Sequence, residues 1–236
     1  MAPDILPIYQ STNEPIYQVR VKICGLTNLE DAQVAAEAGA DLLGFIFYEK
    51  SPRYVTPDVV REITYELRRT PFTARSASPV LVGVFVNAGT AQILETLAHC
   101  GLDLAQLHGE EDASTAAALA GRAFKALRPR TVVEAEEAAS RFVPYSPADG
   151  PDILLDAWHP ALRGGTGETG DWSLAAALTT HHRVLLAGGL TPDNVAEAIR
   201  QVRPWGVDVA SGVEASPGRK DHGRVREFVR TVKGNR

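Results

Sequence analysis

The sequence predicts an α/β protein folded as a single (βα)8 TIM barrel, and three observations support this prediction. Short apolar segments rich in β-branched residues alternate with longer segments in which apolar residues recur at helical spacing. Eight such pairs follow one another along the chain. The chain has 236 residues, which is close to the roughly 250 that one barrel of this kind needs and too few for two full α/β domains. An open, doubly wound sheet with extra strands is the alternative architecture.

The predicted strands are apolar at consecutive positions, as expected of strands that are buried on both faces of a parallel sheet. In chain order they span Val19–Cys24, Leu42–Phe47, Val80–Val86, Leu102–Leu107, Ala123–Leu127, Ile153–Asp156, Val184–Ala187 and Val207–Ala210.

A predicted helix follows each strand, and several of these helices have recognisable ends. Asn28 is followed three residues later by Asp31, which is a capping pattern, and Gly39 and Gly101 stand where the preceding helices should end. Thr191-Pro192 places proline at a first helical position. The predicted helices span Asn28–Ala38, Pro57–Arg69, Thr90–Ala98, Asp112–Leu119, Val132–Phe142, Trp172–Leu178, Pro192–Arg200 and Asp221–Val232.

The composition excludes several classes of protein. There are 24 basic and 29 acidic residues, giving a net charge of −5 without a run of either sign, so neither nucleic acid nor a membrane surface is an expected partner. No segment approaches the roughly 18 consecutive apolar residues of a membrane span. Residues 1–18 lack the apolar core of a signal peptide and are interpreted as an N-terminal extension, followed by a catalytic barrel domain over residues 19–236.

The cysteines and histidines predict neither a disulfide framework nor a metal site. Cys24 and Cys100 are the only cysteines and lie far apart, which favours a reducing, cytoplasmic compartment. The six histidines form no cluster with metal-ligand spacing. We therefore expect no bound metal, and we expect the chain to be a monomer or a homodimer.

Candidate catalytic residues stand where predicted strands end, because the active sites of such barrels lie at the carboxyl ends of the strands. Cys24 ends the first strand and is either a small buried residue or a thiolate base. Asp156 ends the sixth and is either a loop cap or a catalytic carboxyl group. Arg53 follows the second strand and is either a solvated charge or a residue whose planar guanidinium group binds a carboxylate. His108 follows the fourth and is a packing or a binding residue, whereas Cys100 ends a helix and is expected to be structural.

Glycines after the last two strands predict a phosphate site. Gly188-Gly189 follows the seventh strand and Ser211-Gly212 follows the eighth. Glycine lets backbone N–H groups approach an anion closely, and a helix N-terminus adds a favourable dipole. Either segment alone could be a tight turn, but together they match the recurrent phosphate site of these barrels. The expected partner is a phosphorylated small molecule.

One further glycine motif does not support a dinucleotide site. Residues 165–170, Gly-Thr-Gly-Glu-Thr-Gly, match G-x-G-x-x-G but do not directly follow a strand and lack the expected acidic residue about 20 positions later. We interpret this segment as an active-site loop with glycine hinges, and residues 70–79 as a loop insertion.

In order along the chain, the motifs resemble the phosphoribosylanthranilate isomerase family over almost the whole length from Val19 to Val232. They are Lys22-Ile23-Cys24-Gly25-Leu26-Thr27-Asn28, Gly39-Ala40-Asp41, Gly44-Phe45, Ser51-Pro52-Arg53-Tyr54, Gly83-Val84-Phe85-Val86-Asn87, Gln106-Leu107-His108-Gly109, Gly164-Gly165-Thr166-Gly167, Asp171-Trp172, Gly188-Gly189-Leu190 and Val207-Asp208-Val209-Ala210-Ser211-Gly212-Val213-Glu214.

The resemblance implies a (βα)8 barrel and a cofactor-free Amadori rearrangement in tryptophan biosynthesis. N-(5′-phosphoribosyl)anthranilate would become 1-(2-carboxyphenylamino)-1-deoxyribulose 5-phosphate. Cys24 matches the family's general base and Asp156 its general acid, and Arg53 matches a basic residue that serves the anthranilate end of the substrate. A protonated Asp156 would open the ribose ring, and Cys24 as a thiolate would then remove a proton from C2′.

Two other classes of function remain as alternatives. One is a related phosphosugar barrel, such as an indole-glycerol phosphate synthase or the Amadori isomerase of the histidine pathway. The latter uses an aspartate base, so a cysteine at position 24 argues against it. The other is a non-catalytic sensor of phosphorylated metabolites, which would keep the phosphate glycines but not both Cys24 and Asp156.

Overall fold

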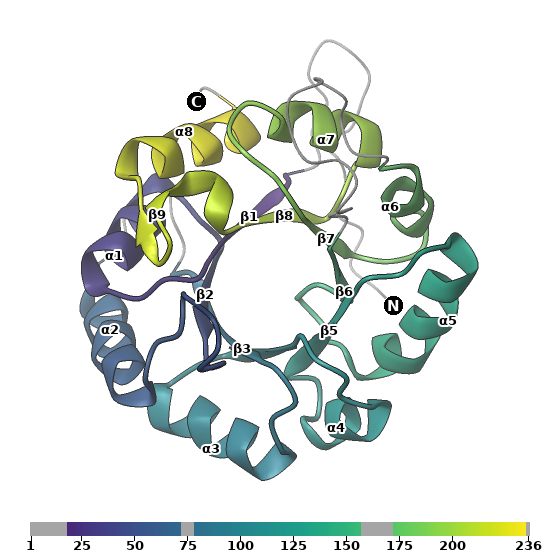
Figure 1. Cartoon of the computed structure of the whole chain (residues 1–236), viewed down its shortest axis with the longest axis horizontal. Coiled ribbons are helices and arrows are strands. Elements are labelled where there is room, and N and C mark those ends of the chain that lie inside the picture. Colours follow the sequence, from purple (N-terminus) through teal and green to yellow (C-terminus); the bar gives the residue numbers. More distant parts are fainter. Residues whose placement is uncertain (1–17, 72–77, 157–171, 235–236) are drawn as a thin grey trace.

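The computed structural model describes residues 18–71, 78–156 and 172–234. Within them, eight parallel strands close into a barrel in chain order, with β1 paired to β8 (Figure 1). This closure confirms the predicted (βα)8 barrel and excludes the open sheet. The strands are β1 Arg20–Cys24, β2 Leu42–Ile46, β3 Val80–Phe85, β4 Leu104–Leu107, β5 Ala123–Leu127, β6 Ile153–Asp156, β7 Val184–Ala187 and β8 Gly206–Val209.

Helices surround this ring of strands (Figure 1). They are α1 Leu29–Ala38, α2 Pro57–Arg69, α3 Thr90–Cys100, α4 Ala113–Ala118, α5 Val132–Phe142, α6 Ser173–Leu178, α7 Val195–Val202 and α8 His222–Lys233. No helix in the described ranges has the length and apolar character needed to cross a membrane. The N-terminal extension up to residue 17, the glycine motif at 165–170 and most of the 70–79 insertion lie outside the described residues.

The strands bury side chains on both faces, in two separate apolar clusters. Val21 and Ile23 pack into the large cluster between the barrel and the helices. Phe124, Leu154 and Leu185 belong to a smaller cluster inside the barrel. Side chains alternate between the two faces of a strand. Every second residue, counted from a member of the inner cluster on the same strand, therefore points toward the barrel axis.

Local end signals are confirmed for α1 and α3. The side chain of Asn28 accepts a hydrogen bond from the backbone N–H of Asp31 at 2.9 Å, and Gly39 and Gly101 adopt the left-handed conformation with φ of 99° and 62°.

The predicted start of the seventh helix is wrong. Helix α7 begins at Val195, and Pro192 lies in a preceding turn. The Asn194 side chain holds that turn, because it accepts from the N–H of Thr191 at 2.8 Å and donates to the carbonyl of Gly189 at 3.0 Å.

Two short features after β8 were not predicted. A 3-10 turn, η3 Ser211–Val213, leads into an antiparallel hairpin of β9 Glu214–Ser216 and β10 Arg219–Lys220. Thr27 donates to the Gly218 carbonyl at 2.6 Å, and the Lys220 N–H donates to the Asp31 carboxylate at 3.0 Å. The hairpin is therefore tied to the segment that joins β1 to α1. A further 3-10 turn, η1 Val143–Tyr145, follows α5.

Candidate active site

The predicted catalytic residues share the inner face of the barrel at the carboxyl ends of the strands. Asp156 is two residues beyond Leu154, which packs inside the barrel. Cys24 alternates with Val21 and Ile23, which pack outside it. Side-chain alternation therefore directs both Cys24 and Asp156 inward at the same rim.

The Cys24 thiol is buried and faces strand β2. Cys24 is only 5% exposed. Gly44 of β2 is the register partner of Cys24 in the sheet. A Cβ on Gly44 would lie 2.9 Å from the Cys24 Sγ, so the absence of a side chain there makes room for the thiol. Burial raises the pKa of the Cys24 thiol, and the nearby ammonium of Lys22 opposes that rise.

A buried ion pair lies next to this thiol. Lys22 and Asp208 are register partners on β1 and β8, and Lys22 Nζ donates to Asp208 Oδ1 at 2.9 Å. The Lys22 side chain is fully buried. Our sequence analysis missed both residues as site members, although a charged residue in the middle of Val21-Lys22-Ile23 and of Val207-Asp208-Val209 was a visible signal.

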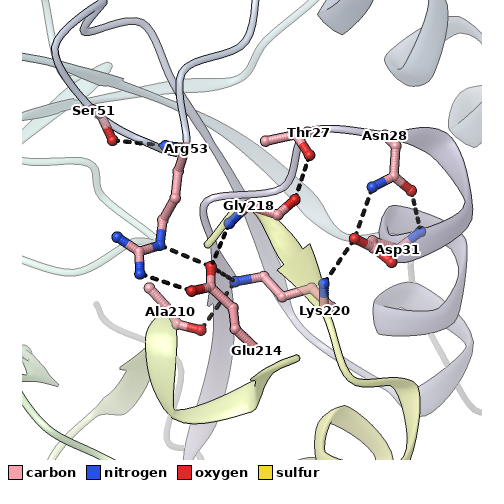
Figure 2. Close-up of polar contacts among 9 residues, drawn as sticks. All are labelled: Thr27, Asn28, Asp31, Ser51, Arg53, Ala210, Glu214, Gly218 and Lys220. Carbon is pink, nitrogen blue, oxygen red and sulfur yellow. Dashed lines mark hydrogen bonds and ion pairs between the residues drawn. The ribbon is translucent and has the colours of Figure 1, made fainter. Parts of the chain in front are cut away.

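Arg53 lies beside Cys24 but is held by a carboxylate of the protein. Its Nε and Nη2 donate to Glu214 Oε1 and Oε2 at 2.8 and 2.7 Å, as Figure 2 shows. Its side chain also crosses Gly25, where a Cβ would lie 2.6 Å from the Arg53 Cδ. Gly25 has φ of 73°, so both its backbone and this close approach require glycine.

Glu214 joins Arg53 to a second buried cation. Lys220 Nζ donates to Glu214 Oε1 at 3.1 Å and to the carbonyl of Ala210 at 3.0 Å (Figure 2). Arg53 and Lys220 hold the pKa of the Glu214 carboxyl below its usual range despite its burial. Neither Glu214 nor Lys220 was named as a candidate site residue from the sequence, because the hairpin that carries them is short and polar.

His108 and Asp156 are linked through Arg128. Arg128 Nε donates to Asp156 Oδ2 at 3.1 Å, and Arg128 Nη2 lies 2.6 Å from His108 Nε2. Burial, and then the charge of Arg128, lower the His108 pKa to about 4, so this imidazole is neutral at pH 7. The Lys22–Asp208 pair also acts on His108, so both parts of the site face one space.

The neutral imidazole lies next to the amide of Gln106. Arginine can only donate, so His108 Nε2 accepts from Arg128 and the ring proton is on Nδ1. Gln106 Nε2 lies 2.7 Å from Nδ1, and Gln106 Oε1 has no hydrogen-bond partner among the described residues. A half-turn of the amide would let Oε1 accept from the Nδ1–H. In either orientation, the Gln106 amide keeps one polar atom for a ligand.

The glycines predicted to bind phosphate bring two loops into contact. Gly188 and Gly189 have φ of 100° and 63°, which favours glycine at both positions. The sequence hypothesis explains Gly212 by the approach of an anion, and the structure adds a second reason for glycine at this position. A Cβ on Gly212 would overlap the carbonyl oxygen of Leu190, so Gly212 is needed for the loops after β7 and β8 to pack together.

Cys100 and the potential metal ligands were also considered in the sequence analysis. Cys100 is fully buried, its thiol donates to the carbonyl of Pro57 at 3.3 Å, and burial raises its pKa to about 11. These observations agree with a structural role. No group of three or more potential metal ligands occurs in the described part of the chain.

Comparison with known proteins identifies the family of this chain. The family model described as N-(5′-phosphoribosyl)anthranilate isomerase matches residues 21–231. The chain belongs to this family. Under the same family name, a Pelobacter propionicus protein is 49% identical over 218 residues, covering 92% of this chain and 97% of that protein.

Solved structures of the phosphoribosylanthranilate isomerase family share the barrel. The Thermotoga maritima structure is 43% identical, with a TM-score of 0.78, covering 92% of this chain and 100% of its own. A second structure, of a complex with reduced 1-(o-carboxyphenylamino)-1-deoxyribulose 5-phosphate, is 41% identical with a TM-score of 0.76 and the same coverage. Members of this family therefore include one that holds a phosphorylated product analogue.

Proposed function

We propose that Cys24 is the general base and Asp156 the general acid of the reaction of this family. The chain is a phosphoribosylanthranilate isomerase, and it converts N-(5′-phosphoribosyl)anthranilate to 1-(2-carboxyphenylamino)-1-deoxyribulose 5-phosphate in tryptophan biosynthesis. The observation that carries the catalytic assignment is the position of both residues on the inner face of the barrel, at the strand ends.

The first step requires an acid, and we assign this role to Asp156. A protonated Asp156 gives its proton to the ribose ring oxygen, the C1′–O bond breaks, and the nitrogen lone pair forms an iminium. Asp156 is paired with Arg128 at 3.1 Å. The Arg128 side chain is largely exposed, so this ion pair is weak and opens at little cost when substrate enters.

The second step requires a base near C2′. A thiolate at Cys24 removes the C2′ proton, and the electron pair moves to the C1′–C2′ bond while the iminium nitrogen becomes neutral. The resulting enolamine then tautomerises to the product ketone. Because the iminium is itself the electron sink, we expect this chemistry to need neither a metal nor a cofactor.

The two ends of the substrate have separate candidate partners. Arg53 uses two of its five N–H donors on Glu214, so its remaining donors can bind the anthranilate carboxylate without breaking that pair. Gly188, Gly189, Ser211 and Gly212 remain our candidates for the phosphate, supported by the contact between their two loops. His108 and the Gln106 amide would serve the sugar hydroxyls between these ends.

Substitution of the two catalytic candidates tests the assignment. We expect Cys24→Ala to lower kcat roughly 10²–10⁴-fold, the range for a lost general acid or base, with an unchanged circular dichroism spectrum. Cys100→Ala is the matched control and should retain its turnover. Near-normal turnover of the Cys24 variant would exclude it as the base.

Asp156→Asn keeps the shape of the side chain but cannot supply the proton. We expect kcat to fall by a similar factor while the affinity for the product, measured by calorimetry, is largely retained. A loss confined to KM would instead make Asp156 a binding residue.

Cellular context is a further part of the proposal. Both cysteines are free, which supports the reducing cytoplasm inferred from the sequence. We retain the prediction of a monomer or homodimer, to be measured by analytical ultracentrifugation.

A further inference from the structure

We propose that Lys22 is a positioning residue for the base: its buried ammonium, anchored by Asp208, stabilises the thiolate form of Cys24. This inference rests on the proposed role of Cys24 and adds a residue that has no other assigned part in the reaction. It follows from the strand register, from the charges that surround the thiol and from a comparison with a second buried lysine of the barrel.

The register of β1 and β2 brings the ammonium and the thiol together. Lys22 and Cys24 are two residues apart on β1, so both point into the barrel. Gly44 of β2 lies opposite Cys24. The point that a Gly44 Cβ would occupy is 2.9 Å from the Cys24 Sγ and 3.1 Å from the Lys22 Nζ. The two polar atoms thus flank the same small space, with no side chain between them.

Asp208 determines where the ammonium lies. Asp208 lies on β8 and is the register partner of Lys22. The 2.9 Å hydrogen bond from Lys22 Nζ to Asp208 Oδ1 fixes the end of the otherwise flexible lysine side chain. The lysine side chain is completely buried, and that of Asp208 nearly so. Separating the two charges would leave each of them buried without a partner, which is energetically unfavourable. The ammonium therefore stays at the Asp208 carboxylate.

The charges around Cys24 are unbalanced toward the positive. The ionisable groups that act on it are Lys22 from β1, Asp208 from β8, Lys220 from β10 and Arg53 from the loop after β2. Glu214 pairs with both Lys220 and Arg53. These two networks hold three cations, namely Lys22, Lys220 and Arg53, and two carboxylates. A thiolate at Cys24 would make the set neutral.

Lys22 is the largest favourable influence on the thiolate. Burial raises the pKa of Cys24, Lys22 lowers it, and Asp208 raises it through its negative charge. Loss of Lys22 should therefore move the titration of the thiol to higher pH, whereas loss of the Asp208 charge should move it to lower pH. A pair without electrostatic influence on Cys24 would not shift the thiol in opposite directions.

The barrel contains a matched pair for comparison. Lys125 of β5 is also buried, and it donates to Glu111 at 2.7 Å with both side chains almost inaccessible. Neither residue is among the main influences on the Cys24 pKa. Lys125→Met therefore reproduces the loss of a buried lysine without changing the surroundings of the thiol.

The experiment titrates the thiolate by its ultraviolet absorbance in a Cys100→Ala background, with the Cys24→Ala, Cys100→Ala protein subtracted. We expect Lys22→Met to raise the apparent pKa by about one unit or more, as for loss of an opposite charge within 4–6 Å. Asp208→Asn should lower it, and Lys125→Met should leave it unchanged. The ascending limb of the pH dependence of kcat/KM should shift in the same directions.

If Lys22→Met does not fold, the double variant with Lys22→Met and Asp208→Asn removes both buried charges, and it should titrate at higher pH than Asp208→Asn alone. Identical titrations in all variants, or shifts of the same sign in Lys22→Met and Asp208→Asn, would overturn the proposal. The thiol titration does not depend on turnover. An active Cys24→Ala protein would therefore refute the base itself, separately from the effect of Lys22.

Discussion

Substitution of Gly212 by alanine should destabilise the protein through one specific contact. The alanine Cβ would overlap the carbonyl oxygen of Leu190 and come within 2.9 Å of its carbonyl carbon. The carbonyl cannot withdraw easily, because Leu190 is buried and the following turn is held by both side-chain hydrogen bonds of Asn194. The loops after β7 and β8 must therefore separate.

The cost follows from overpacking rather than from backbone strain, because Gly212 does not have a positive φ. Inserting a methyl group into a packed site typically costs about 1–3 kcal/mol. Each kcal/mol lowers Tm by roughly 2–4 °C in a domain of this size. We expect Gly212→Ala to lower Tm by roughly 2–12 °C.

Urea and thermal unfolding measure this effect, with Gly89→Ala as the control. Gly89 has ordinary φ, and no atom lies within 4 Å of its Cβ position, so only about 0.5 kcal/mol is expected there, from the helix cap. Calorimetry with the phosphorylated product and with a dephosphorylated analogue then tests the phosphate site. Wild-type stability of Gly212→Ala would refute the packing argument. Equal loss of affinity for the two ligands would refute the assignment of phosphate to these loops.

Two further predictions concern the buried carboxylates. Glu214→Gln loosens Arg53 and leaves the Cys24 side chain itself in place, so steady-state kinetics should show a larger increase in KM than decrease in kcat; the opposite balance would place Arg53 in the chemical step. The pKa of Glu111 is held low, despite burial, by Lys125 and by the Asn87 N–H group. Its contribution to stability is therefore present above about pH 4.5 and is lost as the pH falls through the lower folded pKa. Glu111→Gln should cost about 3–5 kcal/mol at pH 7 by leaving Lys125 unpaired and should flatten the acid dependence of the urea midpoint; an unchanged dependence would contradict this.

The residues at the strand ends were predictable because their placement depends on a local pattern. An apolar segment of four to six residues marks each strand, and the position after it marks the rim of the barrel. Cys24 and Asp156 were identified in this way, and side-chain alternation places both on the inner face. The helix caps at Asn28 and Gly39 were equally predictable, since each hydrogen bond spans only a few residues.

The partners of these residues were not predictable from local patterns. Arg53 meets Glu214 at a separation of 161 residues, and Lys22 meets Asp208 at a separation of 186. Lysine within an apolar strand is a recognisable anomaly, but nothing near it in the sequence identifies its carboxylate. The packing of Gly212 against the carbonyl of Leu190 was not predictable either, because Leu190 lies on a different loop.

The sequence by itself determined the order and type of the elements and the residues at the barrel rim, because hydrophobic periodicity and capping act within about ten residues. Only the tertiary structure decided which charges neutralise one another and which glycine is needed for packing. Closure of the barrel between β1 and β8 places Asp208 against Lys22, and the hairpin after β8 places Glu214 and Lys220 against Arg53. These contacts arise from strand register and from the path of a loop, and both are set by the folded barrel as a whole.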